Sequence, residues 1–84
     1  MKAIGYQGYK QIAYQDVADP SIQSQTVAIV RIERTTICGS DLHLYHGPPR
    51  QEMVEFTLGH EFLGTVEDVG SDVRRFKRGD RVLF

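Results

Sequence analysis

The residues best suited to chemistry in this sequence are Cys38 and the adjacent pair His60 and Glu61. A thiolate sulfur, an imidazole nitrogen and a carboxylate oxygen form the donor set of catalytic zinc sites. Cys38 precedes an expected helix start, where unpaired backbone N–H groups and the helix dipole favour the thiolate, the form that binds metal. These three residues are therefore a candidate zinc site.

Isolated residues of these types more often have ordinary structural roles. Cys38 could be a small buried apolar residue, and His60 could be a hydrogen-bonded histidine of the core or of a loop. Ser40 suits a helix cap, His43 an exposed helix position, and Asp41 a solvated first turn stabilised by the dipole. Residue types alone leave both interpretations open.

Short strands must position these residues, because alternating side chains in residues 1–8, 11–17 and 26–34 indicate strands. The clearest alternation runs over residues 26–34, where Ala28, Val30 and Ile32 share one face. We expect strands over residues 1–8, 11–17, 26–34, 62–69 and 81–84, joined by turns. No βαβ unit is present, so the predicted fold class is mainly β, a barrel or sandwich with one short helix.

The one expected helix lies directly after Cys38. Gly39 breaks the preceding strand, Ser40 is the expected N-cap, and residues 41–45 fit one or two helical turns. Gly47 and the two prolines after it end the helix. Cys38 is therefore expected at a corner between a strand and a helix.

Composition bounds the possible classes of protein. A hydrophobic fraction of 40% with 25% charged residues is typical of a globular chain, and 84 residues hold one core at most. The net charge of −1, with Asp72 and Asp80 interleaved with the basic residues of the run 74–81, speaks against nucleic-acid binding. One cysteine excludes an internal disulfide, and no stretch looks like a signal peptide or a membrane span, so we expect a cytoplasmic chain.

Because the sequence stops within the apolar run 82–84, we expect it to be truncated.

Two motifs carry a resemblance to a known family. Residues 37–43, Ile-Cys-Gly-Ser-Asp-Leu-His, and residues 59–64, Gly-His-Glu-Phe-Leu-Gly, resemble the zinc-dependent medium-chain alcohol dehydrogenases. The likeness extends over essentially the whole chain. It implies that residues 1–84 are the N-terminal portion of an incomplete catalytic domain, a partial GroES-like β-barrel with one short helix.

The resemblance also implies a metal site. Cys38 and His60 would bind the catalytic zinc, and Glu61 would be a ligand in the resting enzyme or a close neighbour. Asp41 falls where the family has a carboxylate that orients the zinc-binding histidine, a contact that fixes the imidazole tautomer. The family's remaining zinc ligand would lie downstream of these residues.

The implied reaction is hydride transfer between a small alcohol or aldehyde and NAD or NADP. In this family's pattern, Ser40 receives the proton of the alcohol and His43 passes it toward water. The eight glycines never take the GxGxxG spacing of a dinucleotide-binding turn. We therefore expect NAD or NADP only in the full-length parent, and no turnover by these 84 residues alone.

Two other functions remain as alternatives. One is a stand-alone GroES-like binding or oligomerisation module, whose exposed strand edges would pair with another copy to form a homo-oligomer while the metal residues stay idle. The other is a relative of the zinc-free quinone reductases, which share the fold. The combination of Cys38 with His60 and Glu61 counts against this last alternative.

Overall fold

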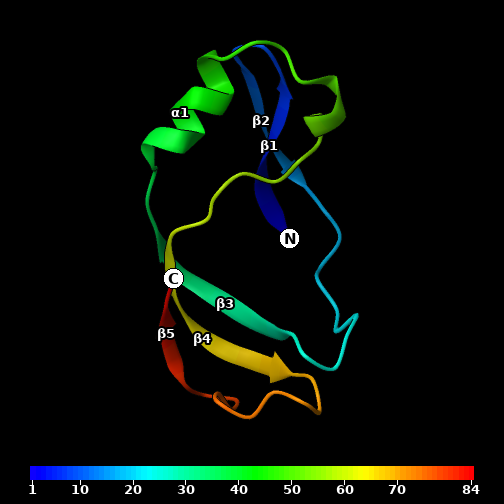
Figure 1. Cartoon of the computed structure of the whole chain (residues 1–84), viewed down its shortest axis with the longest axis vertical. Coiled ribbons are helices and arrows are strands. Elements are labelled where there is room, and N and C mark those ends of the chain that lie inside the picture. The colour runs from blue at the N-terminus through cyan, green and yellow to red at the C-terminus, as the bar shows by residue number, and fades with distance from the viewer. The chain divides into compact units, whose positions relative to one another are not determined.

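The computed structural model describes residues 1–84 and divides them into two compact units (Figure 1). The first contains Met1–Ala18 and Thr36–His60, and the second contains Asp19–Thr35 and Glu61–Phe84. Five strands and a single short α-helix make up most of the regular structure, which confirms the mainly β fold class. The strands form two open sheets, and neither sheet closes on itself. No helix is both long and apolar enough to cross a membrane.

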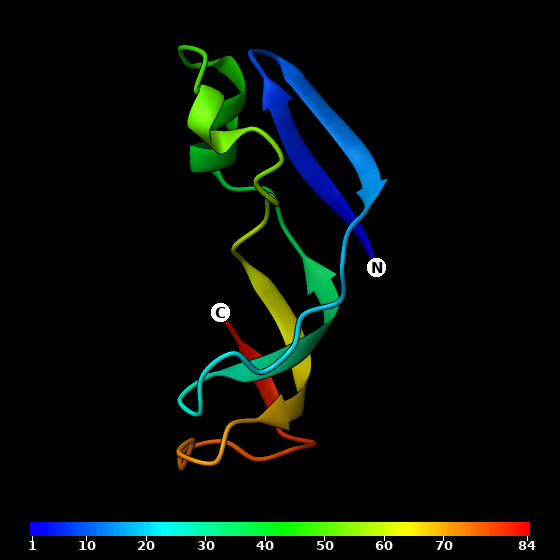
Figure 2. The ribbon, with the colours of Figure 1, turned by 90° about the vertical axis from the view of Figure 1, so that its right-hand side faces the viewer.

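The first unit is built on a β-hairpin. Strands β1 (Lys2–Gly8) and β2 (Gln11–Asp16) pair in antiparallel fashion, as Figure 2 shows. Gly8 at φ +134° and Lys10 at φ +53° turn the chain between them. Glycine suits such a position because it has no Cβ to clash with the backbone. The hairpin predicted over residues 1–17 is confirmed.

The other edge of β1 is covered by an irregular segment, residues 55–58. The Leu58 N–H donates to the Ile4 carbonyl at 2.8 Å, and the Tyr6 N–H donates to the Phe56 carbonyl at 2.9 Å. Tyr6 is thereby enclosed from both sides and has no exposed surface. A short 3₁₀ turn, η1 (Gln51–Met53), precedes this segment.

Helix α1 (Gly39–His46) follows Cys38, as predicted, but it begins differently from the prediction. The N-cap is Cys38, so the expectation that Ser40 caps the helix is wrong. The physical reason is Asp41, whose Oδ2 accepts the Cys38 backbone N–H at 2.9 Å. A carboxylate that reaches back by three residues gives the backbone N–H at the helix start a hydrogen-bond acceptor. Ser40 lies inside the first turn, and its hydroxyl is left for other contacts.

The second unit is a three-stranded antiparallel sheet in the order β3-β4-β5 (Figure 1). Strand β3 covers Ala28–Thr35, β4 covers Phe62–Val69 and β5 covers Arg81–Leu83. Val66 of the central strand, 2% exposed, forms its core. Gly64 is required beside β3, because a Cβ there would lie 2.4 Å from the Arg31 carbonyl oxygen. All three predicted strands are confirmed, with ends that differ by two residues at most.

Glu33 joins the three strands of this sheet. It is the extra residue of a bulge in β3, accepts a short hydrogen bond from the Thr65 hydroxyl of β4, and pairs with Arg81 of β5 at 3.0 Å. The Thr65 hydrogen bond and then the Arg81 guanidinium lower the pKa of Glu33 below its ordinary 4.5. The ionised carboxylate therefore favours the folded state.

This arrangement predicts a pH dependence of stability. A lowered folded-state pKa gives a contribution that is present above pH 4.5 and lost as the pH falls below that value through the folded-state pKa. Glu33→Gln should lower the Tm slightly at pH 7 and flatten the fall of Tm below pH 4.5. Thermal unfolding followed by circular dichroism between pH 3 and pH 7 checks this, with the exposed Glu52→Gln as control. Equal pH profiles for both variants would contradict it.

Candidate metal centre

Cys38 and His60 lie together in the first unit. Their ligand atoms are within 4.8 Å of one another, and the Cys38 thiol is not in a disulfide. Zinc lies about 2.3 Å from a thiolate and about 2.0–2.1 Å from an imidazole nitrogen, so tetrahedral ligands of these types are separated by roughly 3.5 Å. A small side-chain movement would therefore let both residues reach one ion.

Two local features of the backbone position the side chains of Cys38 and His60. Cys38 is half-buried at the start of α1, where the Asp41 carboxylate holds its backbone N–H. His60 follows Gly59, whose φ of +107° turns the chain after the segment paired with β1. Glycine is again the residue that adopts this backbone conformation without strain.

The imidazole of His60 has a polar neighbour at each ring nitrogen. Its Nδ1 lies 3.4 Å from Asp41 Oδ1, and its Nε2 lies 3.3 Å from the Ser40 hydroxyl oxygen. A carboxylate beside Nδ1 favours the tautomer with the proton on that nitrogen, which leaves Nε2 as the basic atom. The Asp41 side chain is only 16% exposed, and the same carboxylate accepts the Cys38 N–H. One acidic side chain thus connects both predicted ligands.

The other two predicted site residues are Glu61 and His43. Glu61 is half-buried and is the first residue of the second unit, bonded directly to His60. His43 is exposed on α1, three residues after Ser40 and hence on the same side of the helix. No hydrogen bond or ion pair in the structure joins its ring to the other site residues.

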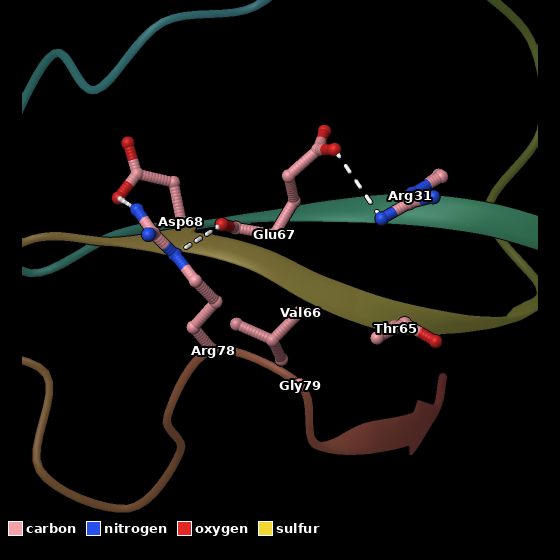
Figure 3. A pocket seen from close by; sticks show the side chains of 7 residues that line it. All are labelled: Arg31, Thr65, Val66, Glu67, Asp68, Arg78 and Gly79. Atoms are coloured by element: carbon pink, nitrogen blue, oxygen red, sulfur yellow. Dashed lines mark hydrogen bonds and ion pairs between the residues drawn. The ribbon is translucent and has the colours of Figure 1, made fainter.

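The second unit has a surface hollow of about 450 Å³ that contains none of the predicted site residues (Figure 3). Each of its two arginines faces an acidic side chain: Arg31 lies 3.5 Å from Glu67, and Arg78 lies 3.4 Å from Asp68. These pairs balance the charge of the hollow, and no donor set for a metal is present in it. Its lining residues are Arg31, Thr65, Val66, Glu67, Asp68, Arg78 and Gly79.

Comparison with known proteins identifies the class to which this fold and site belong. Residues 24–84 match the family described as the alcohol dehydrogenase GroES-like domain. The chain therefore belongs to this family.

Two curated relatives are dehydrogenases or dehydrogenase-like proteins by name, and one of them is named as zinc-type. The chain is 49% identical, over its whole length, to an uncharacterized zinc-type alcohol dehydrogenase-like protein of Bacillus subtilis. It is 39% identical to D-arabitol-phosphate dehydrogenase of Enterococcus avium, over 98% of the chain. These matches span 22% and 24% of the relatives, so the chain corresponds to less than a quarter of their length.

Solved structures give the same result. The apo form of zinc-dependent alcohol dehydrogenase 2 from Streptococcus pneumoniae superposes with a TM-score of 0.88 at 48% identity, covering 99% of this chain and 24% of that one. The 2R,3R-butanediol dehydrogenase of Bacillus subtilis gives a TM-score of 0.82 at 34% identity, covering 98% and 26%. The resemblance stated from the sequence motifs is confirmed.

Proposed function

We propose that this chain supplies the first ligands of the catalytic zinc in an NAD- or NADP-linked alcohol dehydrogenase. In this proposal residues 1–84 are the N-terminal part of an incomplete GroES-like catalytic domain. The observation that carries it is the proximity of Cys38 and His60, with Asp41 in contact with both. The zinc-type relatives support the same function over the alternative of an idle module.

The donor atoms fit zinc. Catalytic zinc sites use three protein ligands and keep one position open for substrate. Cys38 and His60 would be two of these ligands, and Glu61 would be a ligand in the resting enzyme or a close neighbour of the ion. When bound, zinc would act as a Lewis acid that lowers the pKa of an alcohol O–H group.

Asp41 would position the ligands without binding the ion. Its carboxylate beside His60 Nδ1 would hold the ring with Nε2 toward the ion, while its second oxygen fixes the backbone of Cys38. Carboxylates in this position raise the basicity of the ligating imidazole. Asp41 therefore links the start of α1 to the geometry of the metal site.

Ser40 and His43 would carry the proton of the alcohol. The Ser40 hydroxyl lies beside His60 Nε2, the nitrogen proposed to face the ion, so it would be close to an alcohol oxygen bound there. His43 is on the same side of α1 and exposed, which suits transfer of that proton to water.

The substrate would be a small alcohol or aldehyde, and the hydride acceptor would be NAD or NADP bound by other parts of the protein. The sequence contains no GxGxxG turn, so we propose that these 84 residues alone do not reduce NAD or NADP. We also propose a cytoplasmic location and a homo-oligomer. The outer edges of β2 and β3, which have no strand partner in their sheets, support pairing with another copy.

Metal content tests the proposal directly. After dialysis against buffered Zn²⁺ and removal of loose ions, elemental analysis should find about one zinc per chain. His46→Ala is a suitable control, because His46 is exposed on the same helix but lies outside the ligand group, and it should retain the ion. A chain that folds but holds no zinc would contradict the proposal and favour the idle module.

A further inference from the structure

Tyr6 contacts both ends of the segment that leads to His60. Its hydroxyl accepts the Arg50 N–H at 3.2 Å, where η1 begins. Its backbone carbonyl accepts the Glu55 N–H at 2.7 Å, and its own N–H donates to the Phe56 carbonyl at 2.9 Å. Tyr6 has no exposed surface, so these bonds are shielded from competition by water.

The segment that Tyr6 holds contains a strained residue. Glu55 has a φ of +73°, in the left-handed region that residues with a side chain rarely adopt. Such a conformation persists only where the surroundings enforce it. The hydrogen bond from Glu55 to Tyr6 is one such restraint, and a second joins the Phe56 N–H to the Met53 carbonyl at 2.8 Å.

The same hairpin also supports the segment that carries Cys38. The Lys10 N–H, in the turn between β1 and β2, donates to the Tyr45 carbonyl near the end of α1 at 3.0 Å. On the other side, the Leu58 N–H bonds to β1 two residues before His60. The two segments that bear the proposed ligands are therefore fixed to one two-stranded support.

We propose that Tyr6 is a positioning residue for the metal centre. By fixing residues 50–56 at both ends, it sets where the chain presents the His60 imidazole to Cys38. Its hydroxyl is the part that acts on the start of this segment, because the backbone bonds of Tyr6 form with any side chain. This inference rests on the proposed function, since it assumes that Cys38 and His60 share an ion.

Tyr6→Phe tests the inference, because it removes the hydroxyl and keeps the buried ring. Co²⁺ is the probe, and the thiolate-to-cobalt absorption band measures both its affinity and its bond to Cys38. We expect Tyr6→Phe to bind Co²⁺ about tenfold more weakly than the wild type, at the lower end of the effect of losing a supporting partner. Tyr14→Phe is the matched control, since Tyr14 lies on the same hairpin but is 70% exposed, and it should bind like the wild type.

A second measurement uses the unaltered chain, so it does not depend on how Tyr6→Phe folds. Coupling between two sites is reciprocal: if loosening residues 50–56 weakens metal binding, metal binding must tighten those residues. Amide hydrogen exchange of Arg50 and Glu55 should therefore slow when Co²⁺ is added.

The outcomes separate the inference from the proposed function. Equal Co²⁺ affinity for Tyr6→Phe and Tyr14→Phe, or unchanged exchange at Arg50 and Glu55, would overturn the role of Tyr6 while leaving the metal site intact. A wild-type chain that folds but gives no thiolate-to-cobalt band would overturn the proposed function itself.

Discussion

Cys38→Ser is expected to reduce the zinc content of the chain from about one ion per molecule to nearly none. The thiolate supplies the negative charge of the proposed ligand pair, and a serine hydroxyl stays protonated at neutral pH. The substitution leaves the backbone N–H that Asp41 accepts, so helix α1 should still form. Elemental analysis after dialysis against buffered Zn²⁺ measures the loss, and circular dichroism verifies the fold. Stoichiometric zinc in folded Cys38→Ser would show that the sulfur is not a ligand.

Asp41→Asn is expected to weaken zinc binding by roughly tenfold to a hundredfold. The amide oxygen of asparagine can still accept the Cys38 N–H and keep the helix start, but the negative charge beside His60 Nδ1 is lost. The imidazole then becomes a weaker donor and is held less firmly. Competition with a chromophoric chelator gives the zinc affinity. The matched control is Asp72→Asn, an exposed aspartate of the second unit, and equal affinities for the two variants would disprove the positioning role of Asp41.

The strands could be predicted from the sequence because their signals are local. The run over residues 62–69 is closed by Gly70, and the strand found there has the predicted bounds. The helix start could not be placed correctly from propensity alone. Serine is a good N-cap by type, but the reach of Asp41 back to the Cys38 N–H places the cap two residues earlier.

The sequence pattern could not predict which residues hold the segment that leads to His60. Residues 50–58 show no regular period, and the hydrogen bonds that hold residues 55–58 in place join them to β1, which lies far away in the chain. Tyr6 was accordingly predicted only as one residue of an alternating strand, although it is the most buried residue of the first unit. Burial of this kind depends on what covers a strand from the other side, and period-two alternation does not encode that information.

The candidate ligands were found from their types and from the family motifs, and the structure adds their geometry. No local rule could predict that residues 38 and 60 come within 4.8 Å, because the intervening chain must fold back along β1 first. The second contact of Asp41, with the Cys38 backbone, was also not foreseen. This contact places the N-cap at Cys38 instead of Ser40.

The central claim is that the sulfur of Cys38 and the ring of His60 bind one ion. X-ray absorption at the zinc edge of the zinc-loaded chain measures this most directly, because sulfur and nitrogen ligands scatter at different distances. We predict one sulfur at about 2.3 Å together with nitrogen or oxygen neighbours at about 2.0–2.1 Å, including the outer-ring scattering of an imidazole. A first coordination sphere of nitrogen and oxygen alone would contradict the claim.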